Sequence, residues 1–247
     1  MARNIVFENH QPYHILNRGI DKRIIFQDTI DFYRFIFLLY ACNFGSPASN
    51  LWRRDVVKAG KAILAGEKPP SKFIQKEHKQ LVDILAITLL PNHYHSILAQ
   101  RMEGGISIFM QKVGVAYSKY FNLRYQRSGR LFQGPFKAIL ISDENYLLRL
   151  LRYIYLNVLD IFQPDWRKRG IKNKGEALKI LNNYRWSSHA DYLGIRDAKL
   201  ITTKGVYNTF FDNFSEEGRN EYEKFLMQWT DKELKKIDPF ILESDGV

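Results

Sequence analysis

Two histidines separated by a single residue, His93 and His95, have the type and spacing needed to hold a metal ion together. They begin a short run ending at Leu98 that follows a Pro91-Asn92 turn and predicts a β-strand. Side chains alternate between the two faces of a strand, so both imidazoles are expected on one face, where they could share a metal ion. A structural or accidental pair is the alternative, because the chain contains six histidines.

A helix expected after Asp143 could bring further reactive groups to such a site. Its apolar stripe consists of Leu147, Leu150, Leu151, Ile154 and Val158. At 100° per residue, Tyr146, Tyr153 and Asn157 fall within about 40° of one another at the edge of that stripe. A phenol there could face a neighbouring metal site, and Asn157 could add an oxygen ligand. The alternative is that Tyr153 is only a packing residue.

Positive charge predominates, with 37 Lys and Arg against 26 Asp and Glu and a formal net charge of +11. Such an excess favours a polyanionic partner. Basic side chains interleaved with aromatic ones are typical of proteins that bind single strands, because they combine phosphate neutralisation with stacking. The candidate DNA contacts are Lys112, Lys119, Arg124, Arg127, Arg130 and Lys137, with Arg18, Lys22 and Arg23 as further candidates. The alternative is a solvated face over an aromatic core.

The pattern of apolar residues predicts the elements that must position these groups. Gly19, after the first strand, is expected to take a positive φ in a turn. The predicted elements are, in order, a strand over 13–18, a helix from 28 to the turn at 43–47, strands over 84–90 and 93–98, a helix over 106–121, a strand over 136–141 and a helix from 143. This order predicts an α+β fold, a ferredoxin-like antiparallel sheet with helices on one face, followed by an extra helix.

Composition divides the chain into two parts. Residues 1–160 form the expected catalytic domain, in which 43–79 are a basic loop insertion with a short helix and no core of its own. Residues 161–247 are expected to form a basic linker and a mainly helical C-terminal extension. Its last part, from Phe210 to Trp229, is rich in aromatic residues and should form one or two small helices.

Several classes of protein are excluded by composition. Cys42 is the single cysteine, so a disulfide framework and a cysteine-based zinc cluster are excluded. The longest apolar runs fall short of the about 20 residues of a membrane helix, and the N-terminus does not resemble a signal peptide. We therefore expect a soluble, intracellular protein without a membrane partner.

Four motifs follow one another along residues 10–160. They are Tyr13-His14-Ile15-Leu16-Asn17-Arg18-Gly19, Pro91-Asn92-His93-Tyr94-His95, the run from Phe121-Asn122 to Gly129-Arg130-Leu131-Phe132-Gln133, and the run from Tyr146-Leu147 to Tyr153-Ile154-Tyr155-Leu156-Asn157. Together they resemble the single-tyrosine HUH transposases. Trp186-Ser187-Ser188 and Tyr192-Leu193-Gly194 extend the similarity to the branch that includes the REP-associated tyrosine transposases.

The resemblance implies a role for each motif residue. His93, His95 and Asn157 would hold Mg²⁺ or Mn²⁺, Tyr153 would be the nucleophile, and Gln133 would join the DNA contacts. Tyr94 stands where an aliphatic residue is usual and should face the other side of the sheet. Many relatives have proline after the asparagine, whereas Val158 should let the helix continue here. The resemblance also implies a homodimer that acts on single-stranded or hairpin DNA in the cytoplasm, near the nucleoid, of a prokaryote.

The chemistry explains these residue types. A phenol with a pKa near 10 is a poor nucleophile at pH 7, so it needs a metal to polarise the phosphate and cations, such as Arg149 and Arg152, to favour phenolate. These two arginines are also candidate DNA contacts. Attack on single-stranded DNA would leave a 5′-phosphotyrosine and a free 3′-OH, from which strands can be rejoined. The sequence thus predicts a DNA transposase, a single-strand endonuclease and strand transferase. Two alternatives are a catalytically idle, domesticated regulator that binds hairpin DNA and a metal-dependent nuclease that activates water.

Overall fold

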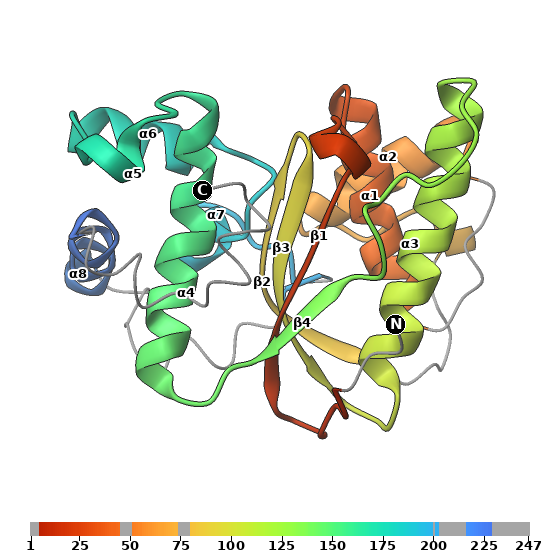
Figure 1. Ribbon diagram of the computed structural model, residues 1–247, viewed down its shortest axis with the longest axis horizontal. Coiled ribbons are helices and arrows are strands. Elements are labelled where there is room, and N and C mark those ends of the chain that lie inside the picture. Colours follow the sequence, from red (N-terminus) through yellow and green to blue (C-terminus); the bar gives the residue numbers. More distant parts are fainter. Residues whose placement is uncertain (1–4, 45–50, 74–79, 200, 203–215, 229–247) are drawn as a thin grey trace.

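A four-stranded antiparallel sheet forms the centre of the molecule in the computed structural model, which describes residues 5–44, 51–73, 80–199, 201–202 and 216–228 (Figure 1). The strands are β1 (Pro12–Arg18), β2 (Val82–Leu90), β3 (His93–Gln100) and β4 (Lys137–Leu140), in the spatial order β2-β3-β1-β4. With α1 (Thr29–Asn43) between β1 and β2, and α3 (Gly105–Arg124) between β3 and β4, this is the predicted ferredoxin-like α+β arrangement.

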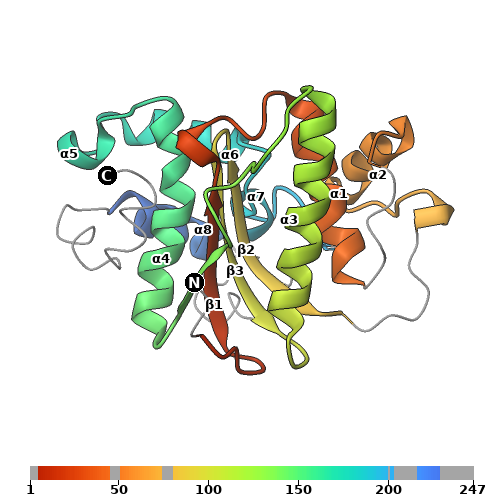
Figure 2. The same cartoon turned by 45° about the vertical axis from the view of Figure 1, so that its right-hand side comes forward.

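The two faces of the sheet carry separate apolar cores, because side chains alternate along each strand. On β1, Ile15 belongs to the core under α1 and α3, whereas the next residue, Leu16, belongs to the core under α4 (Glu144–Leu156). Helices α1 and α3 therefore cover one face, as predicted. The extra helix α4 covers the opposite face (Figure 2).

Capping residues fix where α1 and α4 begin. The Asp28 carboxylate accepts hydrogen bonds from the backbone N–H groups of Ile30 and Asp31, and Asp143 accepts one from Tyr146. This backbone contact and the neighbouring Ser142 hydroxyl lower the pKa of Asp143 below its ordinary value. The α-helix of α4 ends at Leu156, and the chain continues as a 3₁₀ helix, η3 (Asn157–Ile161). The helix therefore continues past Val158, as expected, but in the tighter 3₁₀ form.

The turn after β1 is built differently from the expectation for Gly19. Its φ is −59°, and the positive φ angles lie at Asp21 and Lys22 in η1 (Ile20–Lys22). Gly19 is needed for space, because a Cβ there would lie 2.3 Å from the carbonyl oxygen of Arg23. The N–H group of Gly19 donates to the carbonyl of Asn92 at 2.9 Å, which attaches this turn to the β2–β3 hairpin.

Within the 43–79 segment, the structure contains α2 (Arg54–Leu64) and η2 (Ser71–Phe73), while 45–50 and 74–79 lie outside the described residues. Val56, Ala59 and Ile63 of α2 join the core under α1. Gly60 permits a close approach, because a Cβ there would lie 2.2 Å from the carbonyl oxygen of Tyr33. This insertion thus shares its core with α1.

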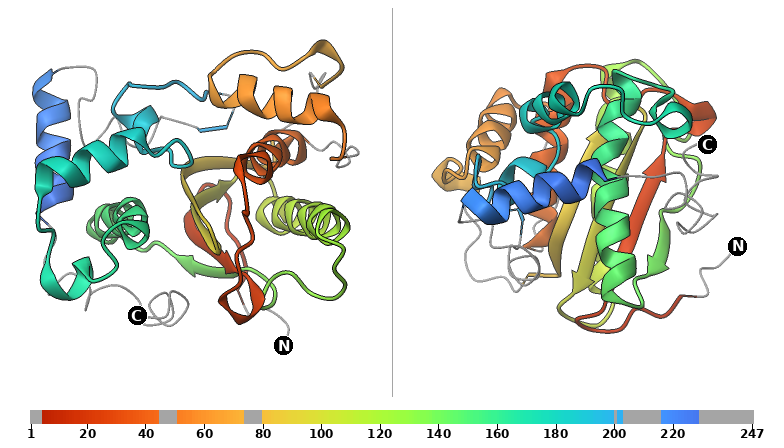
Figure 3. Two further views of the ribbon diagram at one scale, coloured as in Figure 1. Left: turned by 90° about the horizontal axis from the view of Figure 1, so that it is seen from above. Right: turned by 90° about the vertical axis from the view of Figure 1, so that its left-hand side faces the viewer.

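The chain after residue 161 packs mainly on α4 and on the free edge of β2 (Figure 3). It forms α5 (Trp166–Arg169), α6 (Lys174–Asn183), α7 (His189–Tyr192) and α8 (Glu216–Met227). The segment before α7 runs along β2: the N–H of Leu89 donates to the carbonyl of Trp186 at 2.9 Å, and that of Ser188 donates to Ile87 at 2.8 Å.

Part of the aromatic C-terminal segment can be located. Helix α8 contains Tyr222, Phe225 and Leu226, whereas Phe210 and Trp229 lie outside the described residues. In the part of the chain that the structure describes, no helix combines the length and apolar character needed to cross a membrane.

Candidate active site

His93 and His95 lie on the face of the sheet that α4 covers, as the alternation predicts. His95 is fully buried and His93 is nearly so. Their ring centroids are 5.0 Å apart and their planes are nearly perpendicular. Tyr94 points to the other face, where it packs against Phe35 and Phe132, again as predicted. The strand thus places both imidazoles on one face of the sheet and Tyr94 on the other.

A third histidine, His14, joins the pair and was not predicted. It lies on β1, next to β3, with its Nε2 atom 2.9 Å from Nδ1 of His95 and its ring stacked on that of His95 at 5.1 Å. The Nδ1 atom of His93 likewise lies 2.6 Å from Oδ1 of Asn92. Each Nδ1 atom is thus engaged by a neighbour, which is the usual environment of histidines that bind a metal through Nε2.

Tyr153 lies on α4 with its ring against His95, at a centroid distance of 5.9 Å in an edge-to-face arrangement. The helix and the strand therefore place the predicted nucleophile beside the histidine pair. The side chain is fully buried. In this arrangement the phenol oxygen is closed to ligands from solution.

Asn157 is the first residue of η3 and is also fully buried. Its Oδ1 atom, the predicted metal ligand, accepts a hydrogen bond from the guanidinium of Arg167. Within the described residues, its Nδ2 atom has no hydrogen-bond partner. The amide oxygen of Asn157 therefore faces a cation in this structure, the guanidinium of Arg167.

Arg167 comes from α5, in the stretch that composition marks as a basic linker, and no sequence signal indicated its position. Its guanidinium also pairs with Asp160 and lies 5.4 Å from the ring centroid of Tyr153. The indole N–H of Trp166 donates to the same Asp160 carboxylate at 2.6 Å. These contacts hold α5 against the end of α4, so the C-terminal extension contributes to the site.

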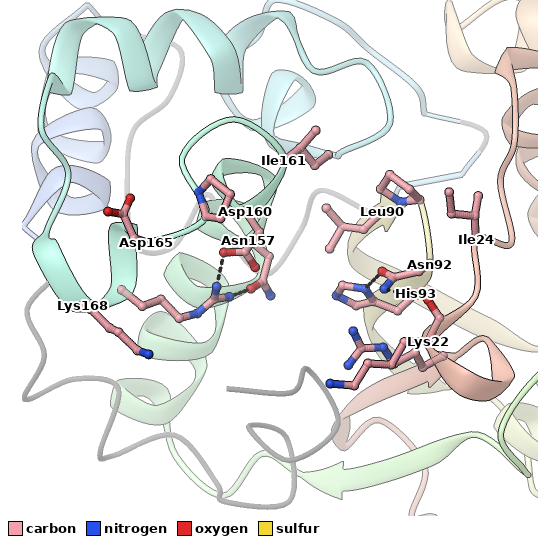
Figure 4. A pocket seen from close by; sticks show the side chains of 14 residues that line it. Lys22, Ile24, Leu90, Asn92, His93, Asn157, Asp160, Ile161, Asp165 and Lys168 are labelled. Carbon is pink, nitrogen blue, oxygen red and sulfur yellow. Dashed lines mark hydrogen bonds and ion pairs between the residues drawn. The ribbon is translucent and has the colours of Figure 1, made fainter.

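A pocket of about 650 Å³ opens between the β2–β3 hairpin and the η3–α5 segment. In Figure 4, Lys22, Asn92 and His93 face Asn157, Asp160 and Lys168 across it. Its basic lining residues are Arg18, Lys22, Arg167 and Lys168, and its acidic ones are Asp160 and Asp165. The excess of positive charge suits an anionic ligand such as a phosphate. Tyr153 does not line this pocket.

A smaller pocket of about 240 Å³ adjoins the first, because Arg18 lines both. Gln133 and Lys137 line it together with Asn17, whose amide donates to the carbonyl of Gly134 at 3.2 Å. Four of the predicted DNA contacts, Arg18, Lys22, Gln133 and Lys137, therefore lie in or beside the site.

The other predicted DNA contacts lie elsewhere. Lys112 and Lys119 are on α3, across the sheet from the histidines, and Arg130 is exposed in the loop after α3. Burial and the positive charge of Arg23 lower the pKa of Arg127.

Three predicted contacts already have protein partners. Arg124 pairs with Asp28 and Asp31. The guanidinium of Arg152 lies 3.9 Å over the ring of Phe225 in α8, and that of Arg149 lies 5.9 Å from Tyr146. Neither arginine beside Tyr153 in sequence lines the large pocket.

The donor set fits a divalent metal in part. Two imidazoles and one amide oxygen are nitrogen and oxygen donors that a metal such as Mn²⁺ accepts. In the part of the chain that is described, no group of three His, Cys, Asp or Glu side chains is arranged to hold a metal ion. The Asn157 oxygen would be the third protein donor, and Arg167 engages it in this structure.

No protein-family model matches the chain, and no curated protein matches it. Among solved structures, a REP-associated tyrosine transposase bound to a REP hairpin is similar, with a TM-score of 0.43 and 12% sequence identity. The alignment covers 78% of this chain and 86% of that one.

Proposed function

We propose that this protein cleaves and rejoins single-stranded DNA beside hairpins, with Tyr153 as the nucleophile. The observation that carries the proposal is the cluster of His93, His95 and Tyr153, beside a positively charged pocket that Asn157 lines. Three of the four sequence motifs support it, because His14, the histidine pair and Tyr153 lie together in the folded chain, while the remaining motif reaches only the adjoining pocket, through Gln133.

In this proposal, His93, His95 and Asn157 hold Mg²⁺ or Mn²⁺. The bound ion would polarise the scissile phosphate and neutralise charge that develops on it. Asn92 and His14 orient the two imidazoles through their Nδ1 atoms. Arg167 must exchange its contact with the Asn157 oxygen before that oxygen can become a ligand.

The protein's own residues position and activate the reacting groups. The phenol oxygen of Tyr153 gives up its proton and bonds to the phosphorus, the bond from phosphorus to the 3′ oxygen breaks, and that oxygen takes up a proton to become the free 3′-hydroxyl. The 5′ phosphate remains on the tyrosine, so a later 3′-hydroxyl can reverse the step without ATP. Arg18 and Lys22, which line the pocket, neutralise the phosphates of the bound strand. Because Tyr153 is buried, DNA binding must be accompanied by movement of α4 or α5.

The remaining parts of the proposal concern partners. Gln133 and Lys137 extend the basic lining toward a flanking nucleotide. Arg127 and Arg130, in the loop after α3, and Arg23, after η1, would contact the DNA further away. A homodimer, acting on DNA in the prokaryotic cytoplasm near the nucleoid, belongs to the same proposal. Light scattering with and without hairpin DNA measures the number of chains in the complex.

The burial of Tyr153 favours a second candidate, a regulator that binds hairpin DNA without cutting it. The position of His93 in the pocket, from which Tyr153 is absent, similarly favours a nuclease that activates water. The three functions differ in their products.

The deciding experiment incubates the protein with Mn²⁺ and end-labelled single-stranded DNA that carries hairpins from the flanks of its own gene. A denaturing gel should show a covalent adduct that Tyr153→Phe abolishes. Tyr146→Phe, on the same helix, is the matched control and should still form the adduct. Cleavage without an adduct would identify the water-activating nuclease, and binding without cleavage would identify the regulator.

A further inference from the structure

The exposed face of α2 carries a row of positive charge opposite its buried face. Val56, Ala59, Gly60 and Ile63 are buried toward α1. At 100° per residue, Arg54, Lys58 and Lys61 fall within about 60° of one another on the other side. All three residues are exposed. We call these three residues the α2 face.

The charges of the α2 face are not neutralised by neighbouring acids. In the part of the chain that is described, no ion pair joins Arg54, Lys58 or Lys61 to a carboxylate. Arg53 differs, because it pairs with Asp55 at 2.8 Å. Three like charges on one side of an α-helix repel one another, so their arrangement favours an anionic partner.

The α2 face is also held in a fixed position. Gly60 packs directly against the backbone of Tyr33, which holds α2 close to α1, and Lys61 lies 5.3 Å from the Tyr33 ring centroid. The three cations span about 10 Å of helix, a length over which one strand of duplex DNA carries about three phosphates. A rigid row of this length suits a regular polyanion better than a flexible one.

An exposed aromatic residue connects the α2 face to the predicted DNA-binding loop. Trp52 is 44% exposed, and its ring lies 5.8 Å from that of Tyr120. The Tyr120 hydroxyl in turn contacts Arg124, at the start of the basic loop over 124–130. Seen from above, α2 lies beyond α1, on the far side of the sheet from α4 and the site (Figure 3). A ligand that touches both must extend across the sheet, and duplex DNA is long and stiff enough to do so.

We propose that the α2 face binds the duplex stem of the hairpin whose single-stranded flank enters the pocket at His93. This inference rests on the proposed function and gives the 43–79 insertion a role in choosing the substrate. It makes stem binding separable from the chemistry, because α2 contributes nothing to the cluster around Tyr153.

The test measures binding without cleavage, using the full chain with Tyr153→Phe in EDTA. The probes are a labelled hairpin with a long stem and a single strand of the same flank without a stem. The triple variant Arg54→Gln, Lys58→Gln, Lys61→Gln is compared with Lys172→Gln, Lys174→Gln, Lys179→Gln, which removes the same charge from exposed positions near α6.

For the hairpin, the slope of log affinity against log salt should become shallower by about 2 to 3 in the α2 variant, since each lost phosphate contact accounts for about 0.9. For the strand without a stem, and for the α6 variant, the slope should stay nearly unchanged. An equal change with both probes, or no change with the hairpin, overturns the proposal. The proposal is also overturned if the α2 variant loses more affinity for anionic lipid vesicles than for the hairpin.

These outcomes are independent of catalysis. A chain that forms no Tyr153 adduct but passes this test refutes the proposed transferase while the stem-binding surface stands. If the chain forms the adduct but fails this test, the proposed transferase activity stands and the proposed contact of α2 with the stem is refuted. Thermal melts of the variants check that all of them fold.

Discussion

At the scale of single residues, one proton between His14 and His95 decides what His95 can do. Only one of the two facing nitrogens can carry it. If Nδ1 of His95 donates, the Nε2 atom keeps its lone pair and can bind a metal. If Nε2 of His14 donates instead, the neutral His95 ring carries its proton on Nε2 and cannot. A metal-binding site therefore requires His14 to act as the acceptor.

Removing that acceptor should weaken metal binding. His14→Phe fills the buried space but accepts no hydrogen bond, and we expect about 10- to 100-fold weaker Mn²⁺ binding in a calorimetric titration. His14→Gln offers a carbonyl oxygen and should retain more of the affinity. Equal losses in the two variants would show that His14 has only a packing role.

Arg167 should act on the same site in the opposite direction. Its guanidinium engages the Asn157 oxygen, and two cations cannot share that buried atom without strong repulsion. We expect Arg167→Ala to bind Mn²⁺ several-fold more tightly than the unchanged chain. Arg169→Ala is the control, because that side chain is exposed and pairs only with Asp165 among the described residues. Weaker binding in Arg167→Ala would mean that the arginine orients the amide for the metal.

At the scale of elements, a buried carboxylate joins α1 to α3. Asp31 accepts hydrogen bonds from the hydroxyls of Tyr120 and Tyr125 and from Arg124. Burial and the Asp31 contact raise the pKa of Tyr120, so its phenol stays protonated and donates. Arg124, predicted from its charge as a DNA contact, therefore also has a structural partner at the end of α3.

Breaking this network should destabilise the protein strongly. Asp31→Ala leaves two phenols without their acceptor and Arg124 with Asp28 alone, and is expected to lower the free energy of unfolding by about 3 to 5 kcal/mol. Asp31→Asn keeps one accepting oxygen and should cost less, about 1 to 3 kcal/mol. Urea denaturation measures both. A loss below 1 kcal/mol in Asp31→Ala would show that the helices are held by their apolar core alone.

A buried histidine joins α6, α7 and α8. His189 lies 2.9 Å from the Asn182 side-chain oxygen and 3.1 Å from the Tyr222 hydroxyl. Burial, with a smaller effect of Arg196, lowers its pKa to about 3. Between that value and about 6.5, the unfolded chain binds a proton that the folded chain excludes. Its contribution to stability is therefore lost progressively as the pH falls below about 6.5.

The corresponding measurement compares urea denaturation of the unchanged chain and His189→Gln at pH 7.5, 6 and 5. The unchanged chain should lose up to about 1.4 kcal/mol per pH unit more than the variant. Parallel pH profiles would mean that His189 titrates alike in both states.

At the scale of the whole molecule, most of the architecture could be predicted from local patterns. Alternation along 93–98 and the Pro91-Asn92 turn were enough to predict the hairpin and the shared face of His93 and His95. Asp28 and Asp143 marked the beginnings of their helices because capping is a local interaction. The order of elements then restricted the sheet to the observed arrangement.

The rest depended on contacts between distant segments. His14 meets His95 because β1 pairs with β3, and no local pattern specifies that register. Arg167 reaches Asn157 because α5 packs on η3, whereas its own sequence resembles an exposed linker. The burial of Tyr153 similarly depends on neighbours far along the chain, so a helical stripe could place it only at an edge.

The hydrogen bonds between β2 and residues 186–188 protect the protein from self-association. β2 is a nine-residue edge strand with buried apolar side chains, and such an edge readily pairs with another molecule. A chain cut after residue 160 would expose it, and light scattering should then detect large aggregates at concentrations where the full chain forms none. A cut chain that stayed dispersed would contradict this. The segment that brings Arg167 to the site thus has a second role, which is to keep the sheet from becoming a template for aggregation.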